Sequence, residues 1–201
     1  MDSGEWDGRY SEHEQMWSGR SNGTLLVEVG GLAPGTALDV GCGEGGDAVW
    51  LAERGWRVTG LDVSRVALAR AQANSRARNV DVEWVCAALA DLEPPAVGYD
   101  LVSVHYPALQ HAPGNDAIHA LLTAVGQGGT LLVVGHARID PEHAQAHGFD
   151  PADYVQPRDV AAQLDDGWVV EVDEERPRVD PSPVGTEHVY DHVLRARRSR
   201  A

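Results

Sequence analysis

Short runs of apolar and β-branched residues recur along the first two thirds of the chain, and longer amphipathic stretches separate them. The short runs predict five buried strands, at residues 38–40, 57–61, 82–86, 101–104 and 130–134. The longer stretches predict helices at 47–54, 64–78 and 116–125, the second capped by Ser64 and the third ended by Gly126. Alternating strands and helices are typical of right-handed βαβ crossovers and a doubly wound, mostly parallel sheet, which binds ligands at the carboxyl ends of its strands.

The pattern changes after residue 134. A polar stretch leads to a short helix at about 157–164, and two apolar runs follow at 168–174 and 188–196 with only a Pro- and Gly-rich turn between them. Because no helix separates these two runs, we expect them to pair as an antiparallel hairpin at the edge of the sheet.

The N-terminal residues 1–34 show few strand signals but carry several aromatic side chains. We expect them to form a helical or irregular cover over the ligand site, with residues 35–201 as the core. The chain is therefore predicted to be one α/β domain, which agrees with its length of 201 residues.

Composition narrows the classes of function. Hydrophobic residues make up 43% of the chain, enough for one core, and no run approaches the roughly 18 apolar residues of a membrane helix. The N-terminus lacks the pattern of a signal peptide, so we expect a cytoplasmic protein that does not associate with membranes. Only two cysteines occur, and we expect both to be reduced. The formal net charge of −15 argues against a nucleic-acid partner.

A glycine-rich turn follows the first predicted strand and carries the strongest chemical signal. It reads Asp39-Val-Gly41-Cys42-Gly43-Glu44-Gly-Gly-Asp47, and such glycines let the backbone bend tightly and approach a ligand. The spacing also fits a dinucleotide-binding turn, but a pyrophosphate there would face the carboxylates of Glu44 and Asp47, which is unfavourable. We therefore expect a cationic nucleoside, and S-adenosylmethionine carries a sulfonium and an ammonium but no phosphate.

The acidic residue Asp62 ends the second predicted strand. A carboxylate at this place can accept two hydrogen bonds from the cis-diol of a ribose. This predicts a nucleoside, although a nicotinamide cofactor would need the same acid.

The motif Asp39-x-Gly41-x-Gly43-x-Gly45, followed by Asp62, resembles the class I S-adenosylmethionine-dependent methyltransferases. Residues 43–56, together with 17–22, are similar to small-molecule enzymes of the tellurite-resistance and thiopurine type. The resemblance implies a seven-stranded Rossmann-like sheet whose last strand is antiparallel.

The same resemblance implies the roles of individual residues. Gly41, Cys42 and Gly43 would line the methionine portion of the cofactor, Asp62 would bind the ribose, and Val63 and Ala88 would lie near the adenine. Asp39 and Leu89 are further predicted cofactor-binding residues. The family often has an acidic residue at the place of Ala88, so the adenine amine here would bind a backbone carbonyl, water or Asp91.

His105 follows the fourth predicted strand, where family members face the transferred methyl group. It could act as a general base for a nucleophile that holds a proton, or it could only shape the site or hydrogen-bond the cofactor. Tyr10 and Trp17 could close over the sulfonium through their aromatic faces or could be ordinary packing residues.

Several alternatives stay open. His136, His143 and His147 could form a metal site if their segment is helical, but we expect no metal. The protein could also be a nicotinamide-dependent oxidoreductase or a non-catalytic S-adenosylmethionine-binding protein. The preferred hypothesis is an enzyme that methylates an O, N, S or metalloid atom of a small molecule and produces S-adenosylhomocysteine, as a monomer or homodimer.

Overall fold

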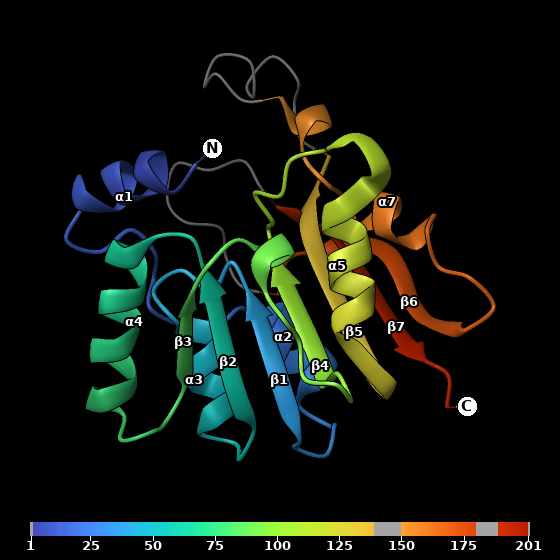
Figure 1. Cartoon of the computed structure of the whole chain (residues 1–201), viewed down its shortest axis with the longest axis horizontal. Helices are drawn as coiled ribbons and strands as arrows, with labels where there is room; N and C mark the ends of the chain where they lie inside the picture. Colours follow the sequence, from blue (N-terminus) through green and yellow to red (C-terminus); the bar gives the residue numbers. More distant parts are fainter. Residues whose placement is uncertain (1, 139–149, 180–188, 201) are drawn as a thin grey trace.

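A computed structural model describes residues 2–138, 150–179 and 189–200, and its centre is one mixed sheet (Figure 1). Seven strands form this sheet: β1 (Thr36–Val40), β2 (Arg57–Asp62), β3 (Glu83–Cys86), β4 (Tyr99–His105), β5 (Val125–Ala137), β6 (Trp168–Pro177) and β7 (Tyr190–Arg198). Their order is β3-β2-β1-β4-β5-β7-β6. The first five strands pair in parallel, whereas β7 is antiparallel to both of its neighbours. The predicted doubly wound sheet with an antiparallel C-terminal hairpin is confirmed.

Helices cover both faces of the sheet. They are α1 (Ser3–Ser11), α2 (Gly23–Val29), α3 (Gly46–Ala52), α4 (Arg65–Ala77), α5 (Asp116–Ala124) and α7 (Pro157–Ala161), with short 3₁₀ turns η1 (Leu89–Asp91), η2 (Pro113–Asn115) and η3 (Pro151–Asp153). As predicted, Ser64 caps α4, because its hydroxyl accepts a hydrogen bond from the amide of Ala67. Figure 1 shows α1 lying across the carboxyl end of the sheet, above α4.

Alternation along the strands separates two cores. Leu38 and Val102 pack with α5 and α7 on one face, whereas Ala37 and Leu101 pack with α2 and α3 on the other. The same alternation places Asp39, Ser103 and His105 on the side of α3. Polar residues that lie far apart in the sequence therefore meet at the first turn of this helix.

The boundary between α5 and β5 differs from the prediction. The helix ends at Ala124, and β5 begins at Val125, five residues before the expected start at residue 130. Val125 pairs with Tyr99 of β4. A Cβ atom on Gly126 would lie 2.5 Å from the carbonyl oxygen of Val97. Gly126 therefore permits close contact between the start of β5 and the turn before β4, and it does not serve as a helix terminator.

The ends of other elements also shift. α7 is shorter than predicted, β6 continues to Pro177, and β7 runs from Tyr190 to Arg198 instead of 188–196. A buried carboxylate joins the hairpin to α2, because Glu28 pairs with Arg176 and with Arg195 (2.9 Å). This packing makes α2 a part of the core as well as of the predicted cover.

We expect Gly126→Ala to lower the free energy of unfolding by about 1–3 kcal/mol, because the new methyl group overpacks the contact with Val97. Urea unfolding measures the change. Gly8→Ala is the matched control, because nothing lies within 4 Å of its added Cβ and alanine favours the helix α1. Equal stability of the Gly126→Ala variant and the unchanged protein would contradict the explanation for this boundary.

Candidate active site

The glycine turn between β1 and α3 has left-handed backbone at Gly41 (φ 68°), Gly43 (φ 53°) and Gly45 (φ 82°). Amides of this turn donate hydrogen bonds to carbonyl oxygens of the protein itself. Gly41 and Cys42 donate to the carbonyl of Leu61 (2.8 and 3.0 Å), and Gly45 donates to that of Cys42 (2.9 Å). A Cβ on Gly41 would meet nothing within 4 Å, so a ligand can approach the backbone closely there.

Asp62 connects this turn to the start of α4. Its Oδ2 accepts a hydrogen bond from the amide of Gly43 and its Oδ1 one from that of Ser64, both at 2.8 Å. Burial raises the pKa of the Asp62 carboxyl, and these amide contacts oppose the shift. Each carboxylate oxygen retains lone pairs that can accept a further hydrogen bond, so the arrangement is compatible with the predicted ribose contact.

Asp39 is the buried acid beneath the turn, with 3% of its surface exposed. The amide of Ala48 donates a hydrogen bond to it, whereas its Oδ2 is buried without a partner in the described part of the chain. Burial, together with the charges of Asp47 and Asp62, raises the pKa of the Asp39 carboxyl. A buried acceptor in this state favours a hydrogen-bond donor or cation beside it, and the ammonium of S-adenosylmethionine fits that requirement.

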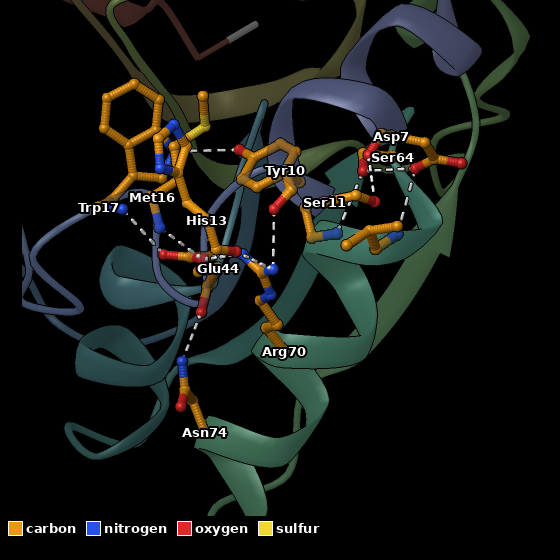
Figure 2. A network of polar contacts seen from close by, with 12 residues as sticks. Asp7, Tyr10, Ser11, His13, Met16, Trp17, Glu44, Ser64, Arg70 and Asn74 are labelled. Carbon is orange, nitrogen blue, oxygen red and sulfur yellow. Dashed lines mark hydrogen bonds and ion pairs between the residues drawn. The ribbon is translucent and has the colours of Figure 1, made fainter.

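Glu44 binds the N-terminal segment (Figure 2). Its carboxylate accepts hydrogen bonds from the amides of Met16 (3.1 Å) and Trp17 (3.0 Å) and pairs with Arg70 of α4 at 2.8 Å. Arg70 also donates to the carbonyl oxygen of Tyr10 (2.8 Å). This network fastens the segment between α1 and α2 to the glycine turn.

Asp47, in the first turn of α3, likewise binds the N-terminal segment, at Asn22. Its two carboxylate oxygens accept from the amide and the side chain of Asn22, both at 2.7 Å. Both carboxylates thus hold residues 16–22, whereas the case against a pyrophosphate in the sequence assumed that they face the ligand. The acids next to the open side of the turn are Asp39 and Asp62.

Tyr10 and Trp17 lie together over the turn (Figure 2). The indole nitrogen of Trp17 donates to the hydroxyl of Tyr10 at 3.0 Å, and a Cβ on Gly43 would lie 2.9 Å from that hydroxyl. Tyr10 is buried, whereas 52% of Trp17 is exposed. The structure thus brings both aromatic residues to the predicted cofactor site.

The other predicted cofactor residues surround the same strand ends less directly. Cys42 is buried, and burial raises the pKa of its thiol, so it stays protonated. Val63 follows Asp62, and the exposed Ala88 lies near it, because the amide of Ala87 donates to the carbonyl of Asp62. Leu89 packs in the core, which leaves only its backbone for a cofactor.

The side chain of His105 is 4% exposed, and its Nδ1 lies 3.3 Å from the Oδ2 of Asp47. Burial lowers the pKa of the His105 imidazole. His105 therefore lies beside the end of the glycine turn, because Asp47 directly follows the glycines of that turn.

Next to His105, a cluster around Tyr106 has no local signal in the sequence. Tyr106 has left-handed backbone (φ 51°), which is strained for a tyrosine, and donates from its hydroxyl to the buried Asp191 at 3.1 Å. Asp191 also accepts from Thr24 (3.1 Å), and the guanidinium of Arg178 lies 4.9 Å from the Tyr106 ring. The ring of His136 stacks on the ring of Tyr106, with centroids 4.3 Å apart.

The possible metal site falls partly outside the described residues, which do not include His143 and His147. Within the described ranges, no group of three or more His, Cys, Asp or Glu side chains is arranged to hold a metal ion. None of the helices in those ranges is long and apolar enough to cross a membrane.

Comparisons with known proteins agree with the fold and the turn. Residues 37–129 match the family model described as a methyltransferase domain. An uncharacterized methyltransferase of Mycobacterium tuberculosis (strain ATCC 25618 / H37Rv) is 37% identical over 123 residues, which are 60% of this chain and 61% of the relative. The chain thus spans about three fifths of the curated relative that it matches.

Two solved structures are similar over nearly the whole chain. One, from work on the conversion of a disulfide bond into a thioacetal group during echinomycin biosynthesis, has a TM-score of 0.78 at 24% identity and covers 98% of this chain and 92% of that chain. The other is the N-methyltransferase NodS from Bradyrhizobium japonicum WM9 in complex with S-adenosyl-l-homocysteine, with a TM-score of 0.73 at 18% identity, covering 98% and 99%. At these identities, the likeness establishes the fold.

We expect Arg70→Met to release the segment that Glu44 holds, because the variant leaves a buried carboxylate without its cation. The free energy of unfolding should fall by about 3 kcal/mol, and amide hydrogen exchange should rise at residues 10–17. Arg78→Met is the matched control on the same helix; its ion pair with Glu53 is exposed, and its loss should change stability by less than about 1 kcal/mol. Unchanged exchange at 10–17 in the Arg70 variant would show that this network does not hold the cover.

We expect Asp39→Asn to stabilise the ligand-free protein at pH values above the raised pKa of Asp39. An unfolded aspartate titrates near pH ~3.9, so between that pH and the raised pKa the folded protein binds more protons, and its stability falls as pH rises. The variant should melt at a higher temperature at about pH 8 and show no gain at about pH 4. Calorimetry measures both, with the exposed Asp166→Asn as control; a lower melting temperature at about pH 8 would contradict the assignment.

Proposed function

We propose that the protein is an enzyme that transfers a methyl group from S-adenosylmethionine to a small molecule, because residues 37–129 match the family model described as a methyltransferase domain. When bound, the cofactor supplies an electrophilic methyl group on a sulfonium that is already a good leaving group. The chain's own residues would then bind, orient and exclude water.

The choice of S-adenosylmethionine over a dinucleotide rests on one observation: the backbone amides of the glycine turn donate their hydrogen bonds within the protein. A pyrophosphate binds through free amides at a glycine turn and helix start, but Gly41, Cys42, Gly43 and Gly45 all donate within the protein. The start of α3 is also covered, since a Cβ on Gly46 would lie 2.6 Å from the carbonyl oxygen of Arg20. These contacts favour a ligand without phosphate.

Charge supports the same choice. Asp39 and Asp62 flank the open side of Gly41, and the nearby cation Arg70 already pairs with Glu44. Within the described ranges no cation pairs with either acid, and two such acids attract a positively charged ligand and repel a dianion. In this proposal the ammonium of the cofactor lies near Asp39, its ribose binds Asp62, and its adenine lies beside Val63 and Ala88.

The way in which the N-terminal segment covers the turn supports a small methyl acceptor. Residues 16–22 are fastened over the turn by Glu44 and Asp47, and Tyr10 and Trp17 close one side of it. The net charge of −15 argues against a nucleic acid as acceptor. The acceptor would then enter near Tyr106.

Calorimetric titration with S-adenosylhomocysteine and, separately, with NADH tests the proposal. We expect binding of the first ligand only, and we expect Asp62→Ala to weaken it by about 30- to 150-fold, equal to ~2–3 kcal/mol, because a charged bidentate contact and the support of Gly43 are lost together. Asp81→Ala, at an exposed aspartate just before β3, is the control and should bind normally. Binding of NADH without S-adenosylhomocysteine would overturn the function, and an unchanged affinity of the Asp62 variant would overturn the ribose contact.

A further inference from the structure

The two ring nitrogens of the buried His105 imidazole differ in their contacts. Its Nδ1 lies 3.3 Å from the hydroxyl oxygen of Ser103 and 3.3 Å from the Oδ2 of Asp47. Its Nε2 is buried and has no hydrogen-bond partner in the described parts of the chain. The two ring nitrogens are thus in different environments.

The position of Asp47 determines which nitrogen carries the proton. An ionised carboxylate can only accept hydrogen bonds, so an unprotonated Nδ1 beside it would place lone pairs against lone pairs. Asn22 fixes this carboxylate with two hydrogen bonds of 2.7 Å, one of them to the same Oδ2 that lies beside His105. We therefore expect the proton on Nδ1, which leaves the lone pair on Nε2.

The backbone after His105 keeps the ring in place. Tyr106 has strained left-handed backbone, its amide donates to the carbonyl of Val134 at 2.7 Å, and its hydroxyl is bound to the buried Asp191. Strain of this kind persists where surrounding contacts enforce it, commonly at functional sites. The turn thus fixes the direction of the imidazole.

We propose that Nε2 of His105 is the general base that removes a proton from the methyl acceptor, that Asp47 is the positioning residue which sets its tautomer, and that the acceptor is a neutral hydroxyl or phenol. This inference rests on the proposed methyl transfer. It goes beyond that function by naming the acceptor group and a role for Asp47 that its contact with Asn22 alone does not require.

The step balances in charge and atoms. The acceptor oxygen forms a bond to the methyl carbon as the methyl–sulfur bond breaks, the bonding electrons stay on sulfur, and the acceptor's proton moves to Nε2. The positive charge of the sulfonium is thereby replaced by that of the imidazolium, which later releases its proton to water. No oxidant, reductant or metal is required.

The charges around His105 agree with a base that is neutral before the reaction. Asp47 from α3, Asp191 from β7 and Arg178 after β6 all act on it, and burial has the largest effect and lowers the pKa of the imidazole. The nearby acids Asp39, Asp47 and Asp191 disfavour an acceptor that is anionic before transfer. A hydroxyl that loses its proton only during transfer avoids this repulsion.

Nuclear magnetic resonance of ¹⁵N-histidine protein tests the tautomer without any acceptor, with His105→Gln identifying the signals. We expect the Nδ1–H form in the wild type, both free and with S-adenosylhomocysteine. Asp47→Asn should weaken this preference and lower the pKa of His105 further, because the charge of Asp47 raises it. Ser103→Ala, which removes the other neighbour of Nδ1, is the matched control and should keep the tautomer. An Nε2–H form in the wild type would overturn the inference.

Methyl transfer to matched phenol and thiophenol pairs then tests the base. We expect His105→Gln to lower turnover of phenols by about 100-fold or more and to leave thiophenols, which ionise on their own, within about threefold. In the wild type, turnover of phenols should rise with pH through the lowered pKa of His105, and Asp47→Asn should move this rise to lower pH. Equal effects on both acceptor classes, or no turnover of any hydroxyl acceptor, would overturn the inference.

S-adenosylhomocysteine affinity separates this inference from the proposed function. His105→Gln should bind it within about threefold of the wild type. A loss of tenfold or more in the His105 variant would assign Nε2 to the cofactor's ammonium and overturn the role as base, while the proposed function would stand. A wild-type protein that fails to bind it would overturn the function itself.

Discussion

Two buried carboxylates at one glycine turn hold the N-terminal part of the site against the sheet. Glu44 binds the amides of residues 16 and 17, and Asp47 binds residue 22, so the turn and its cover form one unit. Buried carboxylates are tolerated only when they are paired or hydrogen-bonded, and here Arg70 and Asn22 supply those partners. The position of Tyr10 and Trp17 over Gly43 follows from this constraint, since Trp17 belongs to the held segment and Tyr10, in α1, accepts hydrogen bonds from Arg70 and Trp17.

The same constraint explains the unequal roles of four neighbouring acids. Glu44 and Asp47 are satisfied by the cover, whereas Asp39 keeps an unpaired oxygen and Asp62 keeps accepting capacity beside the open side of Gly41. Negative charge that the chain does not neutralise is therefore concentrated where a ligand can approach. A cationic nucleoside would lower the electrostatic free energy of the loaded protein, and burial of Asp39 without that ligand is unfavourable.

Sequence reasoning predicted the parts that depend on local patterns. The strands before residue 105, the N-cap at Ser64 and the antiparallel hairpin follow from side-chain period, capping and turn chemistry. The start of β5 was missed because Gly126 resembles a helix terminator, and only the close approach of Val97 reveals its other role. The hydrogen bonds that Glu44 accepts from residues 16 and 17 have no signal in the sequence, because they depend on how the N-terminal segment docks on the turn and on α4. The contact between Tyr106 and Asp191 joins residues 85 positions apart, and no short-range pattern predicts it.

These differences divide the site into two parts with different origins. The proposed cofactor contacts lie almost entirely within residues 37–129, which match the methyltransferase domain family, and they follow one glycine turn and one strand end. The proposed acceptor side includes Asp191 and Arg178 from the C-terminal hairpin region and is covered by residues before 37, and all of these lie outside the matched range. The resemblance to known methyltransferases is therefore informative about the methyl donor, whereas the acceptor has to be inferred from this chain's own groups, above all from the bare nitrogen of His105.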